Sequence, residues 1–112
     1  MAKLVSKTYG DALFELALED DKLDLFFEEA QAVMDIFKDN DEFVKLLNHP
    51  KIGKDDKVQV VENVFKERIS APFTGFMVLM VKKDRQRDFL PVMQYFIAVS
   101  YTHLTLPTMA VV

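Results

Sequence analysis

Two histidines, His49 and His103, are the side chains best suited to acid–base or metal chemistry in this chain of 112 residues. Neither stands at metal-ligand spacing from the other, and the chain contains no cysteine, so a zinc site has no ligand set. His49 directly precedes Pro50, and proline disfavours helical geometry in the residue before it. We therefore interpret His49 as a residue at a helix end, and we predict that the chain binds no metal or cofactor.

Two short motifs resemble ligand-binding loops only superficially. The run Asp39-Asn40-Asp41 could open a calcium loop, but Val44 and Pro50 stand where such a loop requires glycine and glutamate. Gly53 and Lys54 lack the earlier glycine that a phosphate-binding loop needs. Neither motif predicts a site.

The acidic pairs at residues 28–29 and 55–56 could in principle supply a general acid and a general base. Their positions fit solvated helix faces and helix starts, and the sequence offers no nucleophile together with a base and an orienting group. We therefore predict that the chain is not an enzyme. The alternative is a ligand-binding or catalytic helical bundle, which would need two or more acids converging between helices.

A basic cluster is formed by Lys82, Lys83, Arg85 and Arg87. We interpret it as charge that complements a helix end rather than as a ligand site. The formal net charge of −4 argues against binding to nucleic-acid phosphates. The N-terminus does not resemble a signal peptide, and no apolar run reaches the roughly 18 residues of a membrane span, so we expect a cytosolic protein.

Apolar residues recur at helical spacing through most of the chain. The helices that this spacing predicts must position the histidines, acidic pairs and basic cluster described above. We expect helices at residues 3–19, 22–38, between 39 and 49, 54–68, 70–83 and 88–97. No segment alternates with a period of two for the length of a strand. The sequence therefore predicts an all-α fold, a compact bundle of about six helices over residues 1–98.

Several helix starts carry capping signals, among them Asp88 before the sixth helix. Ser70 is expected to cap the fifth helix, with Pro72 in its first turn. Asp39 and Glu42 have the spacing of a capping box for the short third helix. The acidic residues 19–21 are expected to supply a cap for the second helix.

The first and fifth helices carry more apolar residues than one face can hold. The main face of the fifth helix has spacing i, i+3, i+4 and i+7, in Phe73, Phe76, Met77 and Met80. Gly10 lies in the middle of the first helix at a cost of about 1 kcal/mol, so we expect it to mark a close helix crossing. Pattern alone leaves open a filled core, a groove for an amphipathic helix, and self-association through the same face.

The last residues, 99–112, depart from the helical pattern. No charged residue follows Asp88, and Pro107 would break a continuing helix. Residues 100–108, Ser-Tyr-Thr-His-Leu-Thr-Leu-Pro-Thr, resemble translated sequencing-adapter read-through at the truncated end of an assembled sequence. We predict that residues 99–112 are a non-native or disordered tail.

Four segments in order carry a family resemblance. Residues 9–17 (Tyr-Gly-Asp-Ala-Leu-Phe-Glu-Leu-Ala) are similar to an opening helix Tyr-Ala-x-Ala-Leu-Phe-x-x-Ala, and residues 43–52 (Phe-Val-Lys-Leu-Leu-Asn-His-Pro-Lys-Ile) to a segment Leu-Leu-x-x-Pro-x-Ile. The other two are Lys57 leading to Val64-Phe65, and residues 76–85 followed by Phe89, Leu90 and Phe96. Together they resemble the N-terminal domain of the F-type ATP synthase delta subunit, whose mitochondrial equivalent is the oligomycin-sensitivity-conferring protein.

The resemblance implies a six-helix domain of a non-catalytic subunit in the peripheral stalk, the stator that stops the catalytic head turning with the rotor during proton-driven ATP synthesis. It implies that the domain binds the N-terminal helix of an alpha subunit in a groove between its first and fifth helices. The residues carried over by position are Tyr9, Ala12, Leu13 and Leu16 on the first helix, and Phe76, Leu79, Met80 and Lys83 on the fifth.

Two departures from the family pattern matter. Gly10 stands where the family usually has alanine, and we expect a small loosening there. Family members continue into a C-terminal domain that binds the b subunits, and this sequence lacks it, so we expect a chain that binds the head without tethering it. The implied location is the cytoplasmic face of the bacterial cell membrane, as a peripheral subunit. The alternative is a generic protein-interaction or self-associating helical bundle.

Overall fold

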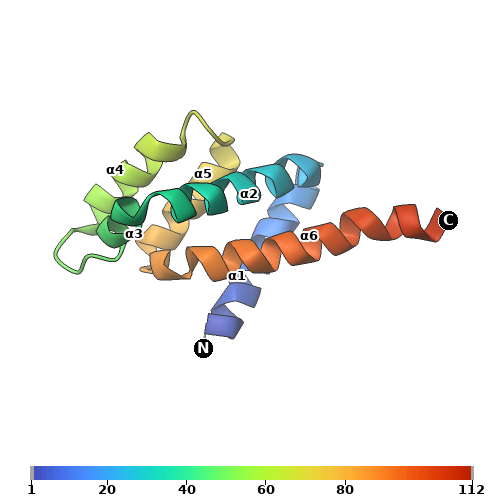
Figure 1. Cartoon of the computed structure of the whole chain (residues 1–112), viewed down its shortest axis with the longest axis horizontal. Coiled ribbons are helices and arrows are strands. Elements are labelled where there is room, and N and C mark those ends of the chain that lie inside the picture. Colours follow the sequence, from blue (N-terminus) through green and yellow to red (C-terminus); the bar gives the residue numbers. More distant parts are fainter. Residues whose placement is uncertain (1, 112) are drawn as a thin grey trace.

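The C-terminal helix, α6 (Phe89–Val111), is the element against which the first two helices pack. The computed structural model describes the backbone of residues 2–111 and the side chains of residues 4–102. The other elements, in chain order, are α1 (Ala2–Glu19), α2 (Leu23–Asp39), α3 (Asp41–Leu47), α4 (Lys54–Phe65), α5 (Ala71–Lys82) and the short 3₁₀ helix η1 (Gln86–Asp88) (Figure 1). The described residues contain no strand, and the predicted all-α fold of six helices is confirmed.

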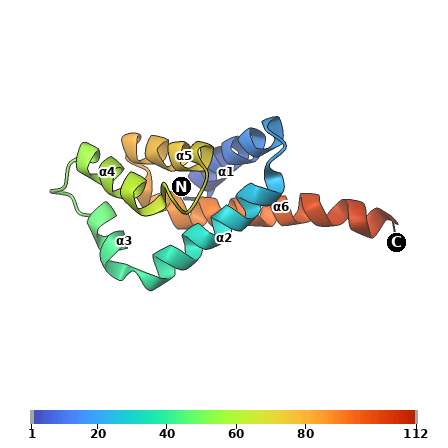
Figure 2. The ribbon, with the colours of Figure 1, turned by 90° about the horizontal axis from the view of Figure 1, so that it is seen from above.

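The helices form two packing groups. α1 and α2 pack mainly against α6, whereas α4 and α5 pack mainly against each other as a hairpin (Figure 2). Aromatic rings join the groups: Phe26 of α2 meets Phe73 of α5 edge to face at 5.3 Å, and Phe37 meets Phe65 of α4 at 6.2 Å. Such pairs add to the burial of apolar area that holds the groups together.

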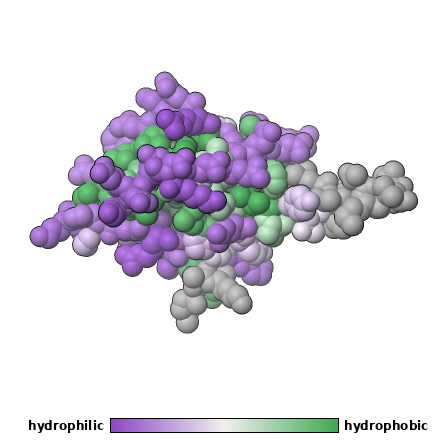
Figure 3. Space-filling model, in the orientation of Figure 1, coloured by the Kyte–Doolittle hydropathy of each residue, from purple (hydrophilic) through white to green (hydrophobic). Residues whose placement is uncertain are grey.

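The core is apolar and almost fully enclosed. Its largest fully buried side chains are Leu13, Phe26, Phe65, Phe73, Met77, Met80, Phe89, Met93 and Phe96. Figure 3 shows one face of the molecule, where hydrophilic residues cover most of the surface and hydrophobic residues are visible between them. The apolar stripes read from the sequence therefore mostly face inward.

α6 continues beyond Ile97, where the sequence pattern ended the helix, and that predicted boundary is wrong. Ser100 is fully buried, and the ring of Tyr101 stacks on Phe27 of α2 with centroids 6.4 Å apart. Packing on α2 thus carries α6 onward. The backbone remains helical through Pro107, since a proline removes one donor from the ladder without necessarily ending the helix. The side chains of residues 103–112 lie outside the described part, and the non-native origin of the tail stays a prediction.

The end of α1 is closed by its own backbone. The Lys22 N–H donates to the Ala17 carbonyl at 2.8 Å and the Asp21 N–H to Leu18 at 3.1 Å, which is a Schellman motif with Asp21 at φ 54°. Lys22 is also the residue that precedes α2, and it makes no side-chain cap. The predicted acidic cap from residues 19–21 is therefore wrong, because these residues finish α1 instead.

The end of α5 repeats this arrangement. The Arg85 N–H donates to the Met80 carbonyl at 2.7 Å and the Asp84 N–H to Val81 at 2.9 Å, with Asp84 at φ 61°. The side-chain Nε2 of Gln86 donates to Asp84 Oδ1 at 3.1 Å.

Helix α4 ends at Phe65, earlier than the predicted residue 68.

The junction between α2 and α3 also differs from the prediction. α2 runs through Asp39, so Asn40 precedes α3 and the predicted capping box of Asp39 and Glu42 is wrong. The Asn40 Nδ2 donates to the Ile36 carbonyl at 2.9 Å. The amide side chain thus closes the end of α2 instead of starting α3.

The left-handed backbone at Asp21 can be tested by substitution. Replacing Asp21 with glycine should raise the free energy of unfolding by about 0.5–1 kcal/mol, because glycine adopts φ > 0 without the Cβ clash. Urea unfolding followed by circular dichroism measures the change. Asp20→Gly is the matched control and should leave the free energy unchanged or lower it; a lower stability of Asp21→Gly would contradict the interpretation.

Candidate partner-binding face

α1 crosses α6 at Gly10, whose missing side chain lets the ring of Tyr95 approach. A Cβ atom on Gly10 would lie 2.3 Å from Cδ1 and 3.1 Å from Cγ of Tyr95. These ring atoms are close to the α6 backbone, so the clash could not be relieved by moving the tip of a flexible side chain. The predicted close crossing at Gly10 is confirmed. The expected loosening is wrong, because glycine is what permits the contact.

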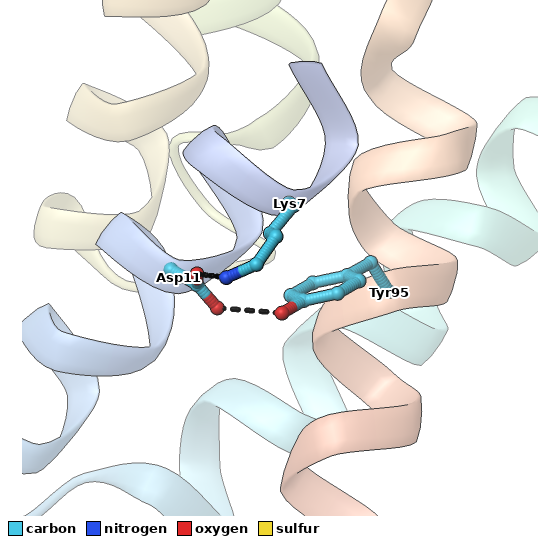
Figure 4. A network of polar contacts seen from close by, with 3 residues as sticks. All are labelled: Lys7, Asp11 and Tyr95. Carbon is cyan, nitrogen blue, oxygen red and sulfur yellow. Dashed lines mark hydrogen bonds and ion pairs between the residues drawn. The ribbon is translucent and has the colours of Figure 1, made fainter. Parts of the chain in front are cut away.

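The same ring is anchored by a polar contact on α1. The Tyr95 hydroxyl donates to Asp11 Oδ1 at 2.7 Å, and Lys7 Nζ donates to Asp11 Oδ2 at 2.8 Å (Figure 4). The side chains of Lys7 and Asp11 are 63% and 42% exposed, so the ion pair itself adds little stability. The network has a geometric effect instead, because the hydrogen bond from Tyr95 to Asp11 holds the tyrosine ring against Gly10.

These contacts shift three ionisation equilibria. The hydrogen bond from Lys7, followed by that from Tyr95, lowers the pKa of Asp11 below its ordinary value. The hydrogen bond to Asp11 raises the pKa of Tyr95, and the same carboxylate raises the pKa of Lys7. Each shift favours the protonation state in which the network is complete.

The start of α5 is held by a carboxylate from another helix. Ser70 precedes α5 as predicted, yet its side chain makes no cap bond to its own helix. Its hydroxyl donates to Oε1 of Glu29 on α2 at 2.8 Å, and its backbone N–H donates to Oε2 of the same carboxylate. Glu29 is only 7% exposed, so its predicted place on a solvated face is wrong. Charged groups are buried where hydrogen bonds compensate them, and Ser70 supplies two here.

The other end of α5 carries the basic cluster predicted from the sequence. Its four side chains are all exposed: Lys82, Lys83, Arg85 and Arg87. Lys54 of α4 donates from Nζ to the Lys82 carbonyl at 3.1 Å. The hydrogen bond from Gln86, followed by the charge of Lys54, lowers the pKa of Asp84. The four cations lie at and just beyond the C-terminal end of α5, where positive charge complements the helix dipole.

The eight residues carried over from the resemblance fall into different environments. Leu13 and Met80 are fully buried in the core, and Phe76 is nearly so. Tyr9 and Leu16 are half-buried, whereas the exposed members are Ala12, Leu79 and Lys83. The structure brings Tyr9 and Phe76 together edge to face at 6.4 Å, which places α1 beside α5.

This contact defines the sides of α1 and α5 that face each other. Successive helix residues are rotated by about 100°, so the α1 stripe through Tyr9 consists of Val5, Tyr9, Ala12 and Leu16. The α5 stripe through Phe76 consists of Pro72, Phe76, Leu79 and Lys83. We call these two stripes the α1–α5 face. Leu13 and Met80 lie behind it.

Two members of the α1–α5 face escaped the sequence prediction. Val5 and Pro72 are half-buried and continue the two stripes by one turn. Spacing of four residues from Tyr9 and from Phe76 would have found them. The face offers partly exposed apolar surface, with Leu79 45% exposed, and a cation at one end. Such a surface suits the apolar side of an amphipathic helix.

Among residues 4–102, whose side chains the structure describes, no three or more metal-ligating side chains come together in a group that could hold an ion. No helix in the described part of the chain is both long and apolar enough to cross a membrane.

Comparison with known proteins identifies the family. The family model of the ATP synthase delta (OSCP) subunit matches residues 5–111. The chain is 54% identical over 98 residues to ATP synthase subunit delta of Lachnoclostridium phytofermentans, covering 88% of this chain and 54% of that protein. It is 39% identical to the subunit of Halothermothrix orenii and 35% to that of Clostridium beijerinckii, covering 77% and 76% of this chain and 49% and 48% of those proteins.

The chain therefore belongs to the ATP synthase delta (OSCP) family, as its sequence motifs predicted. The subunits of this family are non-catalytic, which confirms the prediction that the chain is not an enzyme. The chain spans about half the length of the curated relatives it matches.

The crossing at Gly10 yields a stability prediction. Gly10→Ala should lower the free energy of unfolding by about 1–3 kcal/mol, because the new methyl group overlaps the Tyr95 ring. Chemical denaturation measures the change. Gly75→Ala is the matched control: Gly75 is also inside a helix, but a Cβ there meets nothing within 4 Å. That variant should gain about 1 kcal/mol through helix propensity.

A double-mutant cycle isolates the contact. In a Tyr95→Leu background, Gly10→Ala should lose much less stability than in the original chain, since the leucine side chain can turn away from α1. Equal losses in both backgrounds would show that Tyr95 is not the obstacle.

The Asp11 network yields a pH prediction. A carboxyl whose pKa is lowered in the folded state contributes stability above its unfolded pKa and loses it as the pH falls through the folded pKa. The unfolded value for Asp11 is about 3.8. Asp11→Asn should therefore be less stable than the parent by a constant amount between about pH 5 and 9, and the gap should narrow in acid. Thermal unfolding across pH measures it; a gap that widens in acid would refute the assignment.

Proposed function

We propose that this chain acts as the head-binding domain of a delta subunit in the peripheral stalk of F-type ATP synthase, and that its α1–α5 face binds the N-terminal helix of an alpha subunit. The observation that carries the proposal is the pair of facing stripes, in which Tyr9 contacts Phe76 while Leu79 stays 45% exposed. Membership of the delta family supports the same assignment.

The chemistry of the face fits a helical partner. Tyr9 and Leu16 keep part of their apolar surface exposed on α1, and Leu79 does so on α5. An amphipathic helix laid along both would remove this surface from water, burying about 800 Å² on each partner in an interface of standard size. Apolar burial of this kind provides the main binding free energy.

The consequence for the enzyme complex is mechanical. A stator subunit bound to the head holds it against rotation and so supports proton-driven ATP synthesis without doing chemistry. The matched part of this chain spans about half the length of its relatives, and we assign contact with the b subunits to their remaining length. The domain would then work at the cytoplasmic face of the bacterial cell membrane as a peripheral part of the complex.

Binding can be tested with a synthetic peptide covering the N-terminal helix of the Lachnoclostridium phytofermentans alpha subunit. Leu79→Asp should weaken the affinity at least tenfold, because it puts a charge into the apolar contact. Isothermal titration calorimetry measures affinity and heat capacity, and the unsubstituted chain should show saturable heat with a negative heat-capacity change.

Leu18→Asp is the matched control, because Leu18 is also 45% exposed but lies off the α1 stripe. It should bind like the unsubstituted chain. Absence of saturable heat with the unsubstituted chain, or equal weakening by both variants, would reject the α1–α5 face as the binding surface. Sedimentation of the free chain shows whether self-association occupies the face instead.

A further inference from the structure

The two walls of the α1–α5 face belong to different packing groups. α1 packs on α6, whereas α5 packs chiefly on α4. The width of the face therefore depends on how the α4–α5 hairpin is seated on the other three helices. Rings provide part of that seating, through Phe26 with Phe73 and Tyr9 with Phe76.

A polar contact defines the position of α5 more sharply than these rings. Ring contacts tolerate sliding, because apolar packing has no fixed direction. The Glu29 carboxylate, in contrast, accepts both the hydroxyl and the backbone N–H of Ser70, one on each oxygen. Together the two bonds hold Ser70, the residue that precedes α5, opposite Glu29 and so restrict its place along α2.

The first turn of α5 connects this contact rigidly to the α1–α5 face. The Ser70 carbonyl accepts the Thr74 N–H at 3.0 Å and the Thr74 hydroxyl at 3.1 Å, so Ser70 is integrated into the first turn of α5. Phe76 follows within two turns, and Leu79 one turn later. A negative charge at a helix N-terminus is favoured electrostatically, which adds to the hold on this end.

We propose that Glu29 is a positioning residue for the α1–α5 face: by clamping Ser70 it sets the place of α5 relative to α1, and hence the spacing that a bound helix must match. The proposal rests on the proposed function for its effect on binding. Its structural half, the clamp on α5, is independent of any partner. Glu29 itself does not belong to either stripe of the face.

Two pairs of variants test the clamp. Glu29→Gln keeps the shape of the side chain but loses one acceptor oxygen, and Glu28→Gln makes the same change at the exposed neighbour. Ser70→Ala removes the hydroxyl donor, whereas Ser70→Thr retains it. Ser70→Ala is the milder variant, and it keeps the test open should Glu29→Gln fail to fold.

The first measurement is amide hydrogen exchange of the free chain by NMR. Glu29→Gln and Ser70→Ala should speed exchange of the Ser70 and Thr74 amides, which donate to Glu29 and to the Ser70 carbonyl, by about tenfold or more, with the amides of α6 unchanged. Glu28→Gln and Ser70→Thr should exchange like the unsubstituted chain. Unchanged protection of α5 in Glu29→Gln would overturn the clamp.

The second measurement is titration with the Lachnoclostridium phytofermentans alpha-subunit peptide, at a temperature where circular dichroism shows every variant folded. Glu29→Gln and Ser70→Ala should weaken binding by roughly fivefold to twentyfold, and the two control variants should not. Full affinity in a folded Glu29→Gln chain with faster α5 exchange would overturn the role in positioning, leaving Glu29 with a structural role only. No binding by the unsubstituted chain would reject the proposed function and the positioning effect with it, while the exchange result still decides the clamp.

Discussion

The approach of α1 to α6 at Gly10 is the constraint on which the rest of the structure depends. The Tyr95 ring of α6 fills the space that a side chain on Gly10 would take, and its hydroxyl donates a hydrogen bond to Asp11 of α1. This crossing fixes the rotation of α1, which decides where its other side chains point. Leu13 enters the core, and Tyr9 turns toward α5. A bulkier residue at the crossing would move all of these together.

The fold class and the family were readable from the sequence because both rest on local signals. Helical spacing of apolar residues found all six helices, and four segments in order gave the family. The end of α6 was missed because Ser100 is buried and Tyr101 stacks on Phe27 of α2, and such tertiary contacts leave no mark in local spacing. Periodicity likewise cannot fix the rotation of a helix, so Leu13 and Met80 were grouped with residues that lie at the surface.

Polar details were the least predictable, since each depends on a partner far away in the chain. Glu29 looked like half of a solvated acidic pair, yet it accepts two hydrogen bonds from Ser70, 41 residues away in the chain. Asp21 looked like a cap for the following helix, yet it ends the preceding one in a left-handed conformation usually given to glycine. In both cases the residue type was informative, but tertiary structure decided which partner the residue contacts.

The arrangement of α1 and α2 on α6 has a consequence for how the domain resists force. Pulling α6 along its axis would shear every turn of its contacts at once, including the tyrosine ring wedged at Gly10. Pulling it sideways would peel the same contacts apart one turn at a time, which requires less force. By this geometry we expect the domain to resist load along α6 better than load across it.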